Sequence, residues 1–168
     1  MQCKNPKQKN MYPDLLLSKS LTLKNLVKGE ESEEYGACQF EISCAESSCV
    51  NHKRVLFRTG KITPTKIGLF VTLWKRIGNG PILPYDTEDP FDLFIVSVRT
   101  PEHFGQFVFP KTILYEKGIL SKEGIGGKRA MRVYPPWDIT DNPQAKKTQK
   151  WQIVHFFTDP EAISARIS

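Results

Sequence analysis

The segment FDLFIVSVRTPEHFGQFVFP, residues 91–110, predicts two neighbouring strands of a sheet. Phe91–Arg99 is rich in β-branched and aromatic residues, which favour strands, and it is the strongest strand candidate in the chain. Thr100–His103 supplies a turn, and Gly105–Phe109 forms the next strand. We therefore expect a sheet whose core includes this pair.

Further strands are expected on both sides of this pair. Their composition and spacing predict four more: Cys38–Ser43, Arg54–Ile62, Gly68–Arg76 and Met131–Tyr134. The apolar density of Gly68–Arg76 favours a central position. Residues 45–51 read as a hairpin loop, and residues 77–81 read as a turn.

Helices are expected at both ends of the chain and after the second strand of the central pair. A rough helical stripe of leucines predicts a helix from Pro13 to its end at Gly29. A second helix runs from Pro110 to Lys117 and is ended by Gly118 at the C′ position. The last long helix is Pro143–Phe157, capped by Asn142 or Asp141, and a short helix or tail follows.

These elements predict one α+β domain over residues 13–168, with a mixed, mostly antiparallel sheet flanked by helices, after a flexible basic N-terminus at residues 1–12. No apolar run approaches the roughly 20 residues of a membrane span. The N-terminus is basic, with no apolar stretch before Asp14, so a secretory signal is not expected. We expect a cytoplasmic protein that does not contact the membrane.

The net charge of +6 is distributed unevenly along the chain. Residues 51–81 carry seven cations and no acid, and residues 111–150 carry nine cations and four acids. Two basic blocks with aromatic residues among them are consistent with a phosphate-binding face. A solvated basic surface without a partner explains the same charges, so both interpretations stay open.

The chain contains no established catalytic signature. The candidates for a metal site are five acids: Glu41, Asp86, Glu88, Asp89 and Asp92. Asp92 lies inside a predicted strand, so it needs a partner such as Arg58 or Arg99. Cys38, Cys44, Cys49 and His52 have ligand types for zinc, but their spacing does not match the usual paired cysteines. Free thiols are the preferred interpretation.

The basic residues are the stronger functional candidates. Alternation places Arg54 and Arg58 on one face of their strand. Cations along a sheet face or rim can neutralise successive phosphates, and Tyr134, Trp137, Trp74 and Trp151 are candidate stacking platforms. The predicted nucleic-acid-binding set is Arg54, Arg58, Lys61, Lys66, Lys75, Arg76, Lys128, Arg129, Arg132, Tyr134 and Trp137.

Several blocks of the sequence resemble the MepB family of small bacterial proteins. The most specific are FVTLWKR (70–76), GGKRAMRVYPPW (126–137) and KTQKWQ (147–152), and the likeness runs from about Tyr35 to Phe157. The resemblance implies a core similar to restriction-endonuclease-like folds and an activity of nucleic-acid binding without evident cleavage.

The endonuclease-like pattern requires an Asp on one strand and Glu-x-Lys on the next. Asp92 fits the first position, but the following strand has Gln106 and no Glu-x-Lys, and Lys111 lies too far along. We therefore expect a non-catalytic protein that binds DNA or RNA and needs no cofactor. The alternatives are a divergent Mg²⁺ nuclease, using Asp92 with Glu41 or an acid of residues 86–89, and a protein-interaction module.

Overall fold

The computed structural model describes residues 21–44 and 52–167, and a six-stranded sheet lies at its centre. All neighbouring strands of this sheet are antiparallel except the β3–β8 pair, which is parallel. The mixed, mostly antiparallel α+β architecture predicted from the sequence is thus confirmed. In spatial order the strands are β1 (Leu21–Lys28), β2 (Cys38–Cys44), β3 (His52–Thr59), β8 (Leu93–Arg99), β9 (Phe104–Pro110) and β13 (Phe156–Phe157).

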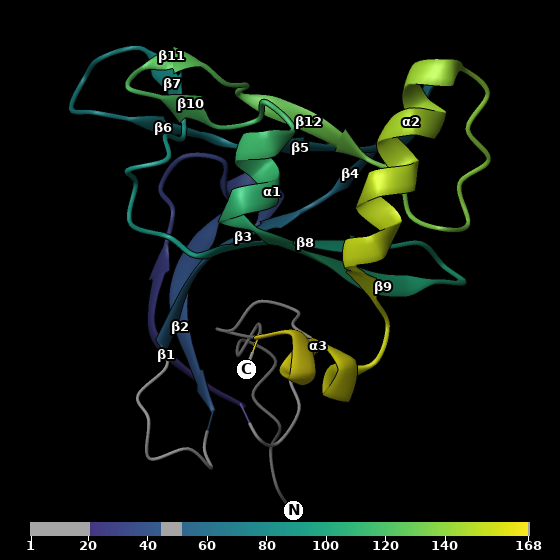
Figure 1. Cartoon of the computed structure of the whole chain (residues 1–168), viewed down its shortest axis with the longest axis horizontal. Helices are drawn as coiled ribbons and strands as arrows, with labels where there is room; N and C mark the ends of the chain where they lie inside the picture. The colour runs from purple at the N-terminus through teal and green to yellow at the C-terminus, as the bar shows by residue number, and fades with distance from the viewer. Residues whose placement is uncertain (1–20, 45–51, 168) are drawn as a thin grey trace, which may run out of the picture.

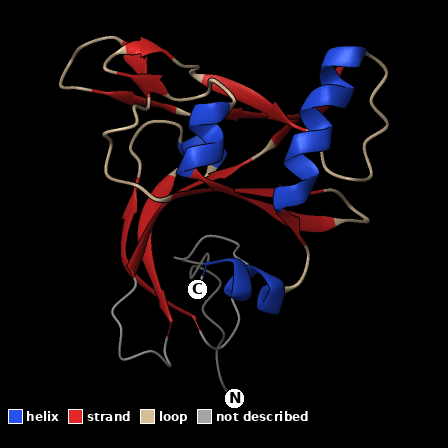
Figure 2. Ribbon diagram, viewed as in Figure 1, coloured by secondary structure: helices blue, strands red, loops and turns tan. Residues whose placement is uncertain are grey.

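Smaller sheets and three short helices complete the described fold (Figure 1, Figure 2). A three-stranded sheet has the order β12 (Ala130–Val133), β5 (Lys66–Thr72), β4 (Lys61–Thr63). Two hairpins are β6 (Trp74–Arg76) with β7 (Ile82–Pro84), and β10 (Ser121–Lys122) with β11 (Ile125–Gly126). The helices are α1 (Lys111–Glu116), α2 (Pro143–Gln152) and α3 (Pro160–Ile167), with 3-10 turns at Glu33–Tyr35 and Ile153–His155.

Strand β8 is buried on both faces. Phe94 and Val96 belong to one apolar cluster with Val71 of β5. Leu93 and Ile95, on the opposite face, belong to a second cluster that includes residues of α3. Figure 1 shows α3 on one side of β8 and β9 and the pair α1, α2 on the other. Burying each such side chain contributes about 1.5–3 kcal/mol to the free energy of folding, so these two clusters stabilise the packing of the helices and smaller sheets on the central sheet.

The predicted helix over residues 13–29 is wrong where the structure describes it. Residues 21–28 form β1, which pairs with β2. The register shifts between Lys24 and Val27, and Asn25 within that interval has a positive φ of 54°. This bulge adds a residue to the strand, so that Leu21, Leu23 and Leu26 follow a spacing that resembles a helical stripe. Residues 13–20 lie outside the described part.

Three predicted elements are shorter than expected. The predicted strand 54–62 stops at Gly60, whose N–H donates to Ser97 O at 2.9 Å. The predicted strand 68–76 is divided at Leu73 into β5 and β6. The Leu73 N–H donates to Arg129 O at 2.8 Å, and Leu73 belongs to neither strand. Helix α2 ends at Gln152 because Phe156 and Phe157 pair with β9 instead.

The other predicted elements agree with the structure to within two residues at each end. They are the strands β2, β8, β9 and β12 and the helix α1. Asn142 caps α2, accepting a hydrogen bond from Ala145 N at 2.8 Å. Gly118, the expected C′ residue of α1, has the positive φ, 69°, that is common at that position. The predicted loop 45–51 falls outside the described residues. Among the helices that are described, none is long and apolar enough to cross a membrane.

Candidate nucleic-acid interface

A groove of about 910 Å³ lies between α1, β12 and α2. Its lining contains five cations and a single acid, Glu116. Two aromatic side chains, Tyr134 and Trp151, also line it. The five cations are Lys117, Lys128, Arg132, Lys147 and Lys150. We call this feature the basic groove.

Strand β12 forms one wall of the basic groove. Its pairing with β5 buries Met131 and Val133, and alternation turns Arg132 and Tyr134 to the other face. The Arg132 guanidinium donates to Thr63 Oγ1 at 2.8 Å and to Gly68 O at 3.1 Å. The Tyr134 ring lies on Gly68, where an added Cβ would come within 2.6 Å of a ring carbon. A side chain at position 68 would therefore displace this ring from the wall.

Two glutamines of α2 fix the opposite wall. Gln152 is fully buried, and its amide accepts from Tyr134 N and donates to Arg132 O, both at 2.9 Å. Gln149 donates at 2.9 Å to Pro135 O and to Asp138 O. These amides bind backbone groups that the sheet leaves unpaired, so they hold α2 against β12 and set the width of the groove.

Only part of the predicted site lies in the basic groove: Lys128, Arg132 and Tyr134. Lys117, Lys147 and Lys150 were not in the predicted set. Lys147 and Lys150 are three residues apart, so they lie near each other on one side of a helix, and this spacing was a usable signal. Trp151, a candidate stacking platform, lines the groove, and Lys117 Nζ lies 5.8 Å from its ring centroid.

The basic residues before position 77 are mostly ion-paired. All four ion pairs within the described residues involve this block: Arg54–Asp92 at 3.3 Å, Lys61–Glu34 at 2.9 Å, Lys75–Asp89 at 2.7 Å and Arg76–Glu31 at 2.8 Å. Lys66 is exposed at the start of β5, and Arg58 is only 5% exposed. Of the predicted cations, four are thus ion-paired, Lys128 and Arg132 line the basic groove, and Arg58, Lys66 and Arg129 do neither.

Arg129 and Trp137 lie outside the groove lining. Arg129 Nε donates to Ile82 O at 3.1 Å, which ties it to β7. The Trp137 ring stacks on His103 with centroids 4.8 Å apart, and it contacts Phe156 edge-on. Its indole N–H is buried without a partner among the described residues. One face of this ring is therefore already occupied by a neighbour.

The two candidate catalytic acids, Asp92 and Glu41, flank Arg54. Arg54 Nε and Nη2 contact the two carboxylate oxygens of Asp92 at 3.3 and 3.4 Å. The backbone N–H of Arg54 also donates to Asp92 Oδ2, at 2.8 Å. Burial would raise the pKa of Asp92, but the contacts of Arg54 outweigh it and hold the pKa below its usual value. Glu41 is opposite Arg54 in the β2–β3 pair and accepts a hydrogen bond from Asn25 at 2.9 Å.

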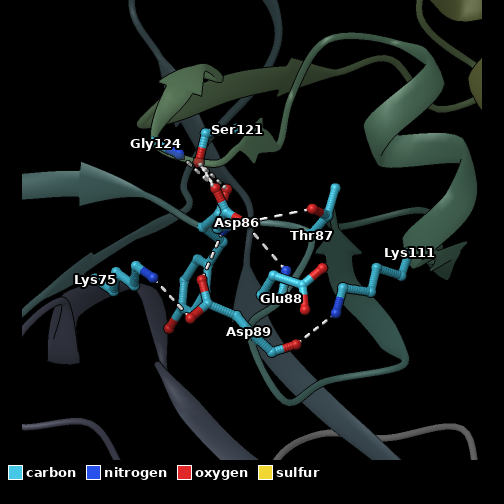
Figure 3. A network of polar contacts seen from close by, with 9 residues as sticks. Lys75, Asp86, Thr87, Glu88, Asp89, Lys111, Ser121 and Gly124 are labelled. Carbon is cyan, nitrogen blue, oxygen red and sulfur yellow. Dashed lines mark hydrogen bonds and ion pairs between the residues drawn. The ribbon is translucent and has the colours of Figure 1, made fainter.

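The remaining acidic candidates belong to a structural network around Asp86 (Figure 3). Asp86 Oδ2 accepts from Ser121 Oγ at 2.7 Å and from Gly124 N at 3.1 Å, and Oδ1 accepts from Glu88 N at 3.1 Å. Asp89 accepts from Asp86 N and pairs with Lys75, while its carbonyl accepts from Lys111. These acids therefore hold the β10–β11 hairpin against the loop before β8.

The cysteine and histidine candidates form no metal cluster in the described part of the chain. Within it there is no group of three or more Cys, His, Asp or Glu side chains that could hold an ion. Cys38 is a free, buried thiol on β2. Cys49 and Cys3 lie outside the described residues.

A family model described as MepB-like matches residues 29–158. A solved structure described as "Crystal Structure of MepB" is 38% identical, with a TM-score of 0.71, over 80% of this chain and 85% of that one. The chain belongs to the MepB-like family. No curated protein matches it. The MepB-like region includes every residue that lines the basic groove.

The first prediction concerns the glutamine that joins the two walls. Replacing Gln152 with Met keeps the side chain's approximate shape but leaves Tyr134 N and Arg132 O unpaired. We expect the free energy of unfolding to fall by about 1–3 kcal/mol. Urea denaturation measures this change, with Gln144→Met, at an exposed position of the same helix, as the control. Equal stability of the two variants would contradict this role of Gln152.

The second prediction concerns pH. Hydrogen bonds from Ser121, Gly124 and Glu88 hold the pKa of Asp86 well below its usual value. Its contribution to stability is therefore complete above pH of about 4, the unfolded pKa, and is lost as pH falls further. We expect Asp86→Asn to lower Tm at pH 7 and the difference from wild type to shrink below pH of about 4. Thermal melts of Glu88→Gln provide the control, and a pH-independent difference would refute the assignment.

Proposed function

We propose that this MepB-like protein binds nucleic acid without cutting it, on a nuclease-like scaffold. The observation that supports the proposal most directly is the basic groove, with five cations, one acid and two aromatic side chains in its lining. Cations spaced along a groove attract successive phosphates and release their counterions. Aromatic rings in the same groove can stack on unpaired bases.

The groove carries more of the proposed affinity than the block before residue 77. Arg54, Lys61, Lys75 and Arg76 already contact carboxylates, so a phosphate would have to replace an existing partner. The gain from such an exchange is small, because one ion pair breaks when the other forms. The lysines of α2 have no ion pair with any described residue, so their charge is available to a phosphate.

The surroundings of Asp92 support the non-catalytic part of the proposal. A metal-dependent nuclease needs carboxylates that converge on one cation. Arg54 lies between the two candidate acids and contacts both oxygens of Asp92. An incoming Mg²⁺ would have to displace this guanidinium. The pairing is therefore better suited to holding β3 beside β8 than to hydrolysis.

The third prediction tests the groove through salt. The affinity for mixed-sequence DNA or RNA should fall steeply between low and moderate salt. The double variant Lys147→Gln, Lys150→Gln should weaken binding at low salt. The slope of log K against log salt, which is negative, should become shallower by roughly 0.7–0.9 for each phosphate that the variant no longer neutralises. Fluorescence anisotropy at several salt concentrations measures both quantities.

Lys24→Gln is the matched control, because Lys24 is exposed on β1 and outside the groove lining. It should leave both the affinity and the slope nearly unchanged. A flat salt response, or no binding by wild type at low salt, would exclude nucleic-acid binding. An equal effect of the control and the double variant would exclude the basic groove as the contact surface.

The fourth prediction separates single strands from duplexes. Tyr134 lines the groove, and its backbone N–H, not its ring, contacts Gln152. Tyr134→Ala should therefore keep the fold and weaken single-strand binding by about 1–3 kcal/mol, the range of base–aromatic stacking. Duplex binding should change less. Tyr115→Ala, at a residue 44% exposed outside the groove lining, is the control for anisotropy measurements with both substrates.

A further inference from the structure

A second pocket, of about 510 Å³, lies away from the basic groove and shares no lining residue with it. It is formed by the end of β1, the segment that follows it, the start of β2, and the β6 hairpin. Its lining includes four cations, Lys28, Arg58, Lys75 and Arg76, and two acids, Glu30 and Glu31. We call it the Arg58 pocket.

Arg58 is the unusual member of this lining. Its side chain is on the face of β3 that contributes Leu56 to the core, and the residue is only 5% exposed. Nη1 donates to Phe57 O at 2.8 Å, whereas Nε is buried with no hydrogen-bond partner. Among the described residues it has no ion pair. The described part of the chain thus leaves this buried guanidinium without an ion-pair partner.

The neighbours of Arg58 leave its charge unbalanced. Glu31 pairs with Arg76, and Asp89 pairs with Lys75. Glu30, the other acid of the lining, forms no ion pair with Arg58. Burial raises the pKa of the Cys38 thiol to about 11, against the opposing effect of Arg58 and Lys28, so this thiol is neutral at pH 7. A guanidinium cannot lose its proton to escape burial. An unpaired buried charge is costly unless an opposite charge joins it.

We propose that the Arg58 pocket binds a small oxyanion, a phosphate or carboxylate group, with Arg58 as its buried anchor. The free Nε side of a guanidinium presents two parallel donors that match two oxygens of such a group. Lys28 adds positive charge at the pocket. Trp74 and Tyr85 also line it, so the ligand is an organic molecule bearing the anion, in a volume typical of small-molecule sites. This proposal does not depend on the basic groove.

The test compares thermal melts and calorimetric titrations of four proteins with inorganic phosphate and with acetate, at constant ionic strength. Wild type and Lys66→Met, which removes an exposed charge outside this pocket, should be stabilised equally by the bound anion. Arg58→Met should lose this response. Without added anion it should be at least as stable as wild type, because an apolar chain replaces an unpaired charge.

Arg58→Lys keeps the positive charge but loses the two parallel N–H donors of the guanidinium, so its affinity for the anion should fall roughly tenfold or more. This variant decides the question even if Arg58→Met does not fold. Two results would overturn the proposal: no response of wild type to either anion, or an unchanged response in both Arg58 variants. A large loss of stability in Arg58→Met without anion would also overturn it, because it would mean that the chain itself supplies a partner.

A labelled oligonucleotide identifies the source of the anion. If the pocket holds a free small molecule, Arg58→Met keeps the wild-type oligonucleotide affinity, and saturating oligonucleotide leaves the phosphate response of wild type intact. If the pocket holds a nucleic-acid phosphate, Arg58→Met binds the oligonucleotide more weakly and the oligonucleotide abolishes the phosphate response. Both outcomes support an oxyanion site at Arg58 and assign it to one of the two sources.

Discussion

The burial of β8 and β9 on both faces is the constraint on which the rest of the fold depends. Apolar side chains on the two faces of these strands belong to two separate clusters, so both faces must be covered. Helix α3 covers one face, and the three-stranded sheet with α1 covers the other. Because β12 is at the edge of that smaller sheet, its backbone has groups left to pair, and Gln152 of α2 binds two of them. The basic groove is a consequence of this covering layer.

The ion pairs change what the charge distribution means. Counted along the chain, residues 51–81 are the most basic segment, with seven cations and no acid. In space, acids from the segments on either side contact four of those cations: Glu31 and Glu34 from before, Asp89 and Asp92 from after. The alternation of acidic and basic blocks along the chain thus largely reflects ion pairs that form between these blocks in the folded protein. The surplus that remains for a partner lies mainly in the later block, along β12 and α2.

Much of the fold could be predicted from the sequence because local patterns specify it. The central strands, β12, α1 and the Asn142 cap follow from apolar runs, glycine and a capping residue. Strand β1 could not be predicted in this way, because the bulge at Asn25 changes the period of its leucines and only pairing with β2 identifies it. The site was predicted in part for a similar reason. Lys128, Arg132 and Tyr134 were expected together, but the lysines of α2 join them only through the tertiary contact made by Gln152.

Arg58 shows how a correct local prediction can have a different meaning in the folded chain. Alternation places Arg54 and Arg58 on one face of β3, and Leu56 between them belongs to the core, so that face points inward. Arg54, near the start of the strand, is exposed and reaches Asp92. Arg58, four residues further on, lies beside the parallel strand β8, opposite Val96, where the neighbouring positions are apolar. Glu30 and Glu31 line the same pocket, but no acid among the described residues forms an ion pair with Arg58, so charge balance in this interior favours an anion from outside the chain.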